Sequence, residues 1–271
     1  MEVSVKEIQE KILVLKSKLP GKIGYYAKDL SSNTVISYNE NAAFDPASTI
    51  KLLLLCAVFS GARKGQFSLD DRITVSDSVK VGGCGVIFEL AAGLNPTVRD
   101  LAKLMVVLSD NTATNMLFDI VGGAAVLEEY ASSLGLKETW FRRKMFDSES
   151  ALRGINNTAT TFELCVILEG LANKTLMHPN DCEEAIGMLL RQQLNNKLPS
   201  KIVDRMEWYA GTNAIKFAHK TGEDEKIEHD AGIAFTARGE IIMAVMTENT
   251  DNEMAVDFIG SFAKEIVEHF M

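Results

Sequence analysis

The sequence lacks a run of 18 or more apolar residues, which excludes a helix that crosses a bilayer. Its longest apolar stretch, residues 52–59, is too short for that and predicts a buried helix. A basic tract is also absent, and 37 acidic against 28 basic residues give a net charge of −9. This balance argues against nucleic acid and anionic membranes as partners. Repeats and linkers are missing too, so the 271 residues predict one large domain or two small ones.

Cysteine is scarce, and the four cysteines contain no Cys-x-x-Cys pair. The four histidines show no spacing typical of metal ligands, so we expect neither a metal nor another cofactor. Cys56 and Cys165 lie in apolar helical contexts and are predicted to be inert thiols of the core.

The first residues, Met1 to Lys6, contain no apolar signal core and no small-residue cleavage site. We therefore expect a cytoplasmic protein as the sequence stands, or an exported one if a signal peptide has been removed. The expected protein is a monomer without stable membrane insertion, whose partner is a small-molecule acyl substrate.

Strand patterns occupy both ends of the chain, and helical patterns fill the middle. Strands are predicted at 23–27 and 35–38 and in a hairpin of 231–235 with 241–246. Helices are predicted at 4–17, 97–107, from about 111, at 161–173, 180–194 and 254–270. One antiparallel sheet must then be built from both termini, with the terminal helices packed on it. We predict a sheet-and-helix subdomain of residues 1–45 and 205–271, a helical subdomain of residues 46–204, and a site between them.

Three short motifs stand in a fixed order along the chain. They are Ser48-Thr49-Ile50-Lys51, Ser109-Asp110-Asn111 and Lys220-Thr221-Gly222. A Ser-x-x-Lys pair arises about once by chance in a chain of this length, and Ser261 with Lys264 is a second match. The two exact tripeptides are each expected only roughly 0.05 times per chain. Their joint occurrence in this order therefore indicates a serine acyl-transfer site.

The first motif combines a nucleophile with an amine. Asp45 is the predicted N-cap and Pro46 the first residue of a helix that is apolar on nearly all sides. Ser48 would lie in its first turn, where free N–H groups favour developing negative charge. Lys51 lies on the same helix face, and burial near Lys220 would lower its pKa so that it can act as a base.

The other two motifs supply groups for the leaving atom and the substrate. Ser109 could relay a proton to the leaving nitrogen, and Asn111 could bind an amide of the substrate, whereas Asp110 is expected to bond local backbone. The third motif would lie on an edge strand, where Lys220 and Thr221 suit a carboxylate. Gly222 lets this strand approach the ligand, and the N–H of Glu223, with that of Ser48, would form an oxyanion hole.

These motifs resemble those of the class A branch of the serine β-lactamase and penicillin-binding protein family, over essentially the whole chain. The resemblance implies an α+β fold: an antiparallel five-stranded sheet flanked by terminal helices, plus an all-helical subdomain. It also implies roles for the motif residues. Ser48 would be the acylated nucleophile, Lys51 and Ser109 would transfer protons, Asn111 would orient the substrate, and Lys220 with Thr221 would hold its carboxylate.

One loop departs from the family pattern. By resemblance, class A enzymes carry a loop glutamate that activates the water which hydrolyses the acyl-enzyme. Direct matching places Met145 at that position, and methionine cannot act as a base. Glu149 begins a Glu-x-x-Leu stretch and is the candidate replacement, with Asp147 as another; the alternative is that both are solvated loop acids.

Charge near the third motif is also unusual. Glu223, Asp224 and Glu225 follow Gly222 and would weaken the binding of an anionic substrate unless they point into solvent. His219 directly precedes Lys220, and we interpret it as a packed, hydrogen-bonded histidine rather than a catalytic one.

Three functions remain open from the sequence. The first is a β-lactamase that acylates at Ser48 and hydrolyses the adduct rapidly. The second is a related D-alanyl carboxypeptidase, esterase or amidase. The third is a penicillin-binding protein that acylates but deacylates slowly. The missing loop base favours the second and third. The three motifs and the class A-like length favour the first, and we predict a serine hydrolase of the class A β-lactamase type.

Overall fold

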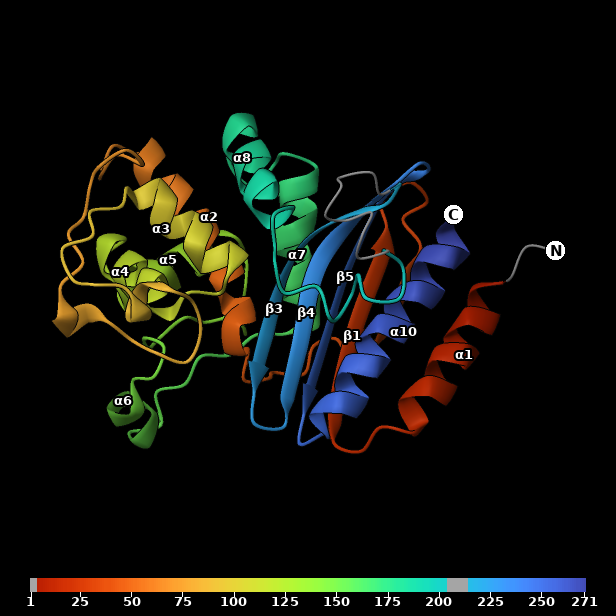
Figure 1. The fold of residues 1–271 in the computed structure, drawn as a ribbon. Coiled ribbons are helices and arrows are strands. Elements are labelled where there is room, and N and C mark those ends of the chain that lie inside the picture. Colours follow the sequence, from red (N-terminus) through yellow and green to blue (C-terminus); the bar gives the residue numbers. More distant parts are fainter. Residues whose placement is uncertain (1–3, 204–213) are drawn as a thin grey trace.

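The computed structural model describes residues 4–203 and 214–271 of the chain (Figure 1). The predicted boundary between residues 204 and 205 lies outside the described residues. An antiparallel sheet with helices on both faces lies beside a group of helices that extends away from it (Figure 1). The predicted α+β class, with an antiparallel five-stranded sheet flanked by the terminal helices, is therefore confirmed.

Five strands form the sheet in the order β2-β1-β5-β4-β3, with every neighbouring pair antiparallel. The strands are β1 Lys22–Asp29, β2 Val35–Tyr38, β3 Lys216–Asp224, β4 Ile227–Thr236 and β5 Gly239–Glu248. The predicted hairpin is β4 with β5, and β1 pairs with β5, so both termini contribute to one sheet. Strand β3 lies at an edge, as predicted for the strand that carries Lys220.

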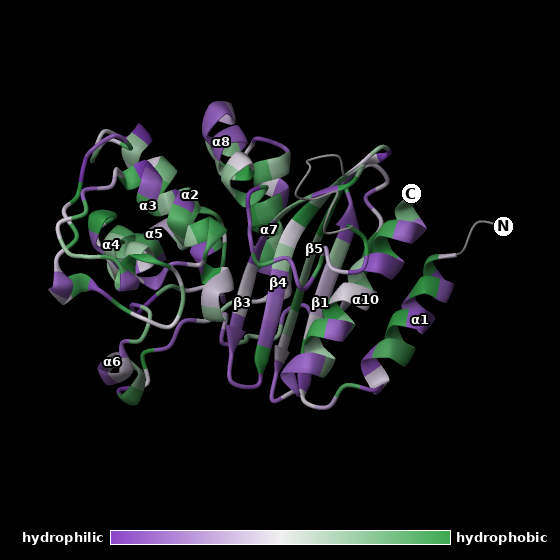
Figure 2. Cartoon of the chain, in the orientation of Figure 1, coloured by the Kyte–Doolittle hydropathy of each residue, from purple (hydrophilic) through white to green (hydrophobic). Residues whose placement is uncertain are grey.

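The two faces of the sheet pack against different helices. Helices α1 (Val5–Ser17) and α10 (Asn252–Phe270) lie side by side on one face, and α7 (Thr161–Ala172) covers the other (Figure 1). Side chains of β5 alternate accordingly. Ile241, Met243 and Val245 join the core under the terminal helices, whereas Ile242, Ala244 and Met246 join the larger core around α7. Helix α7 is hydrophobic over most of its length (Figure 2).

The remaining α-helices of the described residues are α2 Lys51–Arg63, α3 Val98–Val107, α4 Asn111–Ile120, α5 Ala124–Ser133, α6 Ser148–Leu152 and α8 Pro179–Leu189. Helix α2 is buried on nearly all sides, as its composition predicts. Helices α5 and α6 were not predicted. The predicted helix 180–194 was too long, because it ends at Leu189. Beyond it, the Gln192 side chain accepts hydrogen bonds from the main-chain N–H groups of Gln193 and Leu194, which replaces helical bonding.

The start of the segment that carries Ser48 differs from the prediction. A 3₁₀ helix, Ala47–Ile50, precedes α2, and Ser48 lies in this turn. Asp45 does not cap a continuous helix; its carboxylate accepts a hydrogen bond from the N–H of Ala47, 3.0 Å away. Ala47 has a φ of +43°, and this left-handed conformation prevents an α-helix from beginning at Pro46.

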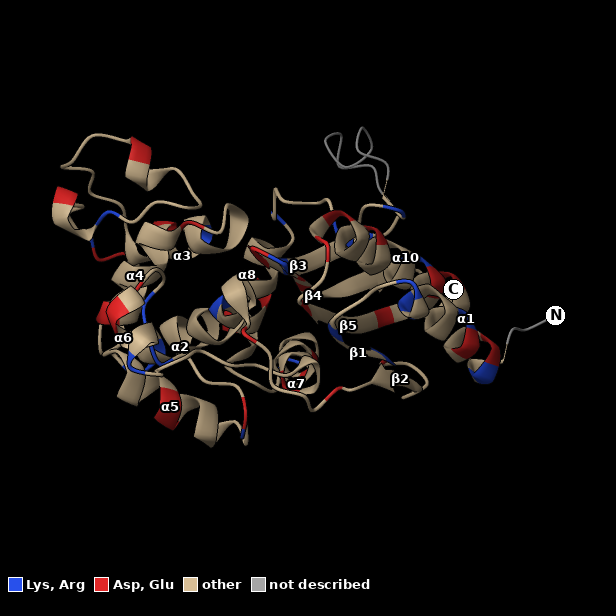
Figure 3. Cartoon of the chain, turned by 90° about the horizontal axis from the view of Figure 1, so that it is seen from below, with Lys and Arg blue, Asp and Glu red and all other residues tan. Residues whose placement is uncertain are grey.

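Charged residues are distributed over the surface, and Figure 3 shows Lys and Arg spread among Asp and Glu. Within the two described ranges, none of the helices combines the length and hydropathy that a bilayer span needs.

Candidate active site

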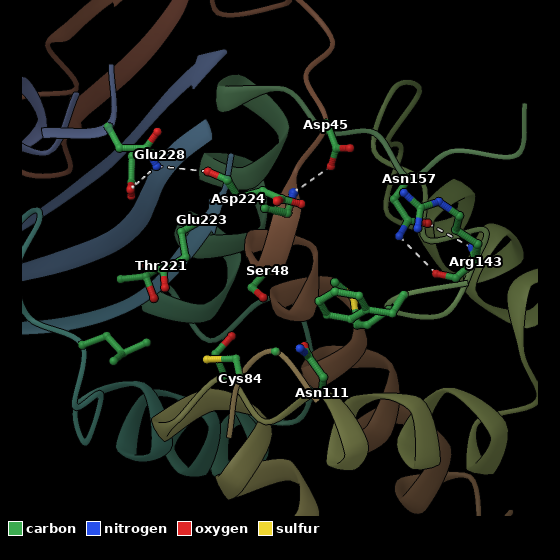
Figure 4. Close-up of a pocket in the computed structure, with 17 residues that line it drawn as sticks. Asp45, Ser48, Cys84, Asn111, Arg143, Asn157, Thr221, Glu223, Asp224 and Glu228 are labelled. Atoms are coloured by element: carbon green, nitrogen blue, oxygen red, sulfur yellow. Dashed lines mark hydrogen bonds between the residues drawn. The ribbon is translucent and has the colours of Figure 1, made fainter. Parts of the chain in front are cut away.

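All three motifs reach one cavity of about 520 Å³ (Figure 4). Ser48, Ser109, Asn111, Thr221 and Glu223 line it. Lys51 and Lys220 are fully buried behind this lining. The cavity therefore joins a turn before α2, the junction of α3 with α4, and the end of an edge strand.

Gly222 allows β3 to lie against the turn that carries Ser48. A Cβ atom on Gly222 would lie 3.0 Å from the Pro46 oxygen and 3.2 Å from the Ser48 nitrogen. These distances are tighter than most real Cβ contacts, so a side chain here would push the strand away from Ser48. Such close approach of a strand edge is a position that favours glycine.

Lys51 has the surroundings of a neutral amine. Its Nζ lies 2.7 Å from the Ser109 main-chain oxygen, 2.8 Å from Asn111 Oδ1 and 3.0 Å from Ser109 Oγ. Burial, and then the charge of Lys220, hold the pKa of Lys51 well below its usual 10.5. All three oxygens lie within hydrogen-bond distance of Nζ, and the lowered pKa favours the uncharged amine, whose lone pair can accept a hydrogen bond from a hydroxyl. Lys51 can thus accept a proton.

Asp110 holds the second motif in place through hydrogen bonds to the backbone. Its carboxylate accepts hydrogen bonds from the N–H groups of Ala113, Val86 and Ile87, so it bonds local backbone as predicted. Ser109 has a φ of +55°, a conformation that the surrounding contacts must impose. Asn111 donates from Nδ2 to the Gly82 oxygen at 3.0 Å. The carboxamide is therefore held between Lys51 and the loop at residue 82.

Lys220 is placed behind the cavity wall. Its Nζ donates to the Thr221 oxygen at 2.7 Å. Burial, with a smaller contribution from the charge of Lys197, lowers the pKa of Lys220 from 10.5 to about 7. A carboxylate that binds at Thr221 would favour the protonated form of this amine.

The loop that follows α5 brings Met145 to the cavity. It brings neither of the two candidate bases there. Met145 lines the cavity, and its main chain is fixed by Asn115: its N–H donates to Oδ1 at 2.8 Å and its oxygen accepts from Nδ2 at 3.0 Å. The Glu149 side chain is 83% exposed and pairs with Arg153. Asp147 caps α6 by accepting from the N–H of Ser150. Neither acid lines the cavity.

Two of the three acids that follow Gly222 do face the cavity. Glu223 and Asp224 line it, together with Asp45 and Glu228, whereas Glu225 does not (Figure 4). Arg143 contributes the one cationic side chain among the cavity-lining residues that the structure describes. Acidic side chains therefore outnumber cationic ones in the lining, and two of them, Glu223 and Glu228, pair with the buried Lys197 at 3.3 and 2.6 Å.

Lys197 is a functional candidate that sequence reasoning missed. It is fully buried, and its Nζ donates to the Gly222 oxygen at 2.9 Å and lies 2.6 Å from Glu228 Oε2. It therefore supports β3 at the point where the strand meets Ser48. Its sequence context is an Asn-Asn-Lys-Leu-Pro segment typical of an exposed loop, so no signal was available. Cys84, also missed, lines the cavity and was signalled only by flanking glycines.

Two histidines stabilise the same strands. His219 is buried, with Nδ1 2.9 Å from the Asp230 carboxylate and Nε2 2.9 Å from Asn195 Oδ1, which confirms it as packed and hydrogen-bonded. His229 Nε2 lies 2.7 Å from the Asp45 oxygen, and Nδ1 lies 2.7 Å from the Glu228 oxygen and 3.1 Å from the Thr247 nitrogen. His229 thereby fixes the chain three residues before Ser48.

His229 makes stability depend on pH. Burial lowers its pKa from 6.5 to about 4. Between these values the unfolded chain binds a proton that the native state does not, so the free energy of unfolding falls as pH drops from 6.5 to 4. The expected contribution is about 3 kcal/mol, fully present above pH 6.5. Urea unfolding at about pH 7, 6 and 5 should show a shallower pH slope in His229→Gln. His269→Gln, on the C-terminal helix, is the control; equal slopes in wild type and His229→Gln would contradict the prediction.

Comparison with known proteins gives consistent matches. Residues 5–270 match the family model described as the beta-lactamase enzyme family. The chain is 33% identical over 121 residues to Beta-lactamase L2 of Stenotrophomonas maltophilia, a match that covers 45% of this chain and only 40% of that protein. It is 24% identical over 258 residues to a beta-lactamase of Streptomyces lavendulae, covering 93% and 82%. The crystal structure of a beta-lactamase from Sphaerobacter thermophilus DSM 20745 superposes with a TM-score of 0.88 at 26% identity, covering 99% and 97%.

Proposed function

The chain belongs to the beta-lactamase enzyme family, and from this premise we propose that it opens β-lactam rings through an acyl-enzyme at Ser48 and releases the product slowly. The observation that carries the proposal is the environment of Lys51. A fully buried amine, three residues after a cavity-lining serine and bonded to Ser109 and Asn111, suits proton transfer and little else.

In the proposed acylation, Ser48 Oγ attacks the lactam carbonyl carbon and its proton passes to Lys51. The oxygen of the tetrahedral intermediate accepts hydrogen bonds from the N–H groups of Ser48 and Glu223. The C–N bond of the ring then breaks, and Ser109 donates its proton to the leaving nitrogen and regains one from Lys51. The substrate carboxylate binds at Thr221 and Lys220, and Asn111 binds the amide of the acyl substituent.

Slow release follows from the composition of the loop around Met145. Deacylation needs a base that activates water within reach of the ester carbonyl. The Met145 thioether lines the cavity where this base would be needed. Glu149 pairs with Arg153 and Asp147 caps α6, both outside the cavity. This observation favours a penicillin-binding mode over rapid β-lactam turnover. The acids near Ser48 favour, as a second candidate, an ester or amide substrate that carries less negative charge.

A chromogenic cephalosporin, followed by absorbance and intact mass, tests the proposal. We expect about one equivalent of rapid colour change and a stable adduct, which Ser48→Ala abolishes. Ser261→Ala is the matched control, because Ser261 begins the second Ser-x-x-Lys match but lies on α10 outside the cavity, and it should keep the adduct. Sustained colour without an adduct would contradict slow release, and no colour with no adduct would overturn β-lactam acylation.

The acidic side of the cavity predicts a charge effect on substrate selection. Asp224→Asn should raise the acylation rate constant for an anionic penicillin by about 2- to 3-fold at low ionic strength, because it removes a negative charge that repels the substrate. The gain is modest because solvent screens the exposed Asp224 carboxylate. Glu225→Gln is the matched control, since Glu225 directly follows Asp224 in the turn after β3 but does not line the cavity. The gain should shrink at about 0.5 M salt. Equal gains in the two variants would show that net charge alone matters.

A further inference from the structure

Phe146 has an unusual position for an aromatic residue. Its side chain is 67% exposed, yet it lines the cavity that contains Ser48. It is the one aromatic ring among the cavity-lining residues of the described chain. A ring with this much exposed area has surface left to bury against a ligand.

The backbone of Phe146 is held in an unfavourable conformation. Its φ is +59°, a value that bulky residues rarely adopt. On one side Asn115 fixes the main chain of Met145, and on the other Asp147 caps α6. The Phe146 oxygen itself accepts a hydrogen bond from the N–H of Ser148 at 3.0 Å. The tertiary contact of Asn115 and these local hydrogen bonds together hold this conformation, and such backbone conformations cluster at functional sites.

The ring packs on the glycine of the opposite loop. A Cβ atom on Gly83 would lie 2.5 Å from Phe146 Cζ and 3.2 Å from Asn111 Nδ2. The ring and the Asn111 carboxamide thus lie close together, on the side of Gly83 where a side chain would project. Under the proposed function Asn111 binds the amide of the acyl substituent, so the group attached to that amide would extend beside this ring.

We propose that Phe146 is a specificity-determining residue whose ring forms the wall against which an aromatic or large apolar acyl substituent packs. This inference rests on the proposed function at Ser48. Met145 adjoins the wall with a polarisable thioether, which also favours aromatic contacts. Aromatic pairs gain from offset or edge-to-face contact beyond the area that they bury. The preferred substrates are therefore acyl donors with an arylacetyl-type substituent.

The test compares benzylpenicillin, which carries a phenylacetyl group, with 6-aminopenicillanic acid, which has the same nucleus and no acyl substituent. Second-order rate constants of Ser48 acylation are measured by intact mass for wild type, Phe146→Ala and Phe146→Leu. Phe146→Ala should lower the rate constant for benzylpenicillin by about 10-fold and leave that for 6-aminopenicillanic acid unchanged, with Phe146→Leu between the two. Since Phe146 is exposed, its removal leaves no core cavity.

Phe88→Ala is the matched control, because Phe88 is another exposed ring, 48% accessible, that does not line the cavity. Its ratio of the two rate constants should equal that of wild type. If both compounds acylate Ser48 and Phe146→Ala keeps the wild-type ratio, the inference is overturned and the proposed function stands. If neither compound forms an adduct with wild type, the proposed function fails and the inference fails with it.

Discussion

Met145→Glu is expected to shorten the lifetime of the acyl-enzyme by about 10²- to 10⁴-fold, the usual contribution of a positioned general base. Met145 already lines the cavity of Ser48, and its main chain is fixed on both sides by the Asn115 carboxamide. A carboxylate at this position would be presented by a rigid segment rather than by a mobile loop. It could then take a proton from a water that attacks the ester carbonyl.

Adduct decay after a short pulse of benzylpenicillin, followed by intact mass, measures this effect. Met145→Gln is the control, because it has the same length and polarity without basicity. Glu149→Gln should leave the decay of the wild-type adduct unchanged, since this side chain is 83% exposed and pairs with Arg153. Equal decay in Met145→Glu and Met145→Gln would show that the slow step lies elsewhere.

Lys197→Met is expected to lower the free energy of unfolding by about 3–5 kcal/mol, because it leaves a buried carboxylate without its counter-ion. Lys197 is fully buried, and Glu228, its partner at 2.6 Å, is 6% exposed. The Gly222 oxygen also loses its donor. Acylation of Ser48 should slow as well, since the end of β3 would be less firmly held against the turn that carries the nucleophile.

Urea unfolding measures the loss, and two further variants define its cause. Lys201→Met removes a lysine whose ion pair with Asp257 is solvent-exposed, and it should change stability by less than about 1 kcal/mol. Lys197→Met combined with Glu228→Gln removes both charges and should recover a large part of the lost stability. If the double variant is no more stable than Lys197→Met, the buried charge is not the source of the loss.

The fold was predictable where short-range patterns carried the information. Two apolar runs on either side of the turn 237–240 identified the β4–β5 hairpin, and the composition of residues 52–59 identified a buried α2. The start of that helix was predicted wrongly, because the left-handed conformation of Ala47 is imposed by packing against β3 and His229 rather than by its own residue type. Likewise, the end of α8 depends on hydrogen bonds of the Gln192 side chain, which bonds Val106 far away in the sequence.

The same division holds for the site. Three local motifs pointed to Ser48, Ser109, Asn111 and Thr221, and the structure brings these four to one cavity. Lys197 and Phe146 carried no such signal, because their importance comes from partners distant in the chain, and Cys84 was marked only by its flanking glycines. Glu149 illustrates the reverse: its sequence context suggested a base, but the loop turns it into solvent.

The sequence by itself determined the family, the sheet built from both termini and the chemical groups that the site can use, because these depend on residue type, order and periodicity. Only the tertiary structure decided which of those groups act together. Burial of Lys51 beside Lys220, the approach of β3 to Ser48 at Gly222, and Met145 rather than an acid at the cavity are consequences of packing. Desolvation, charge proximity and close contact arise between residues far apart in the chain, so no local pattern encodes them.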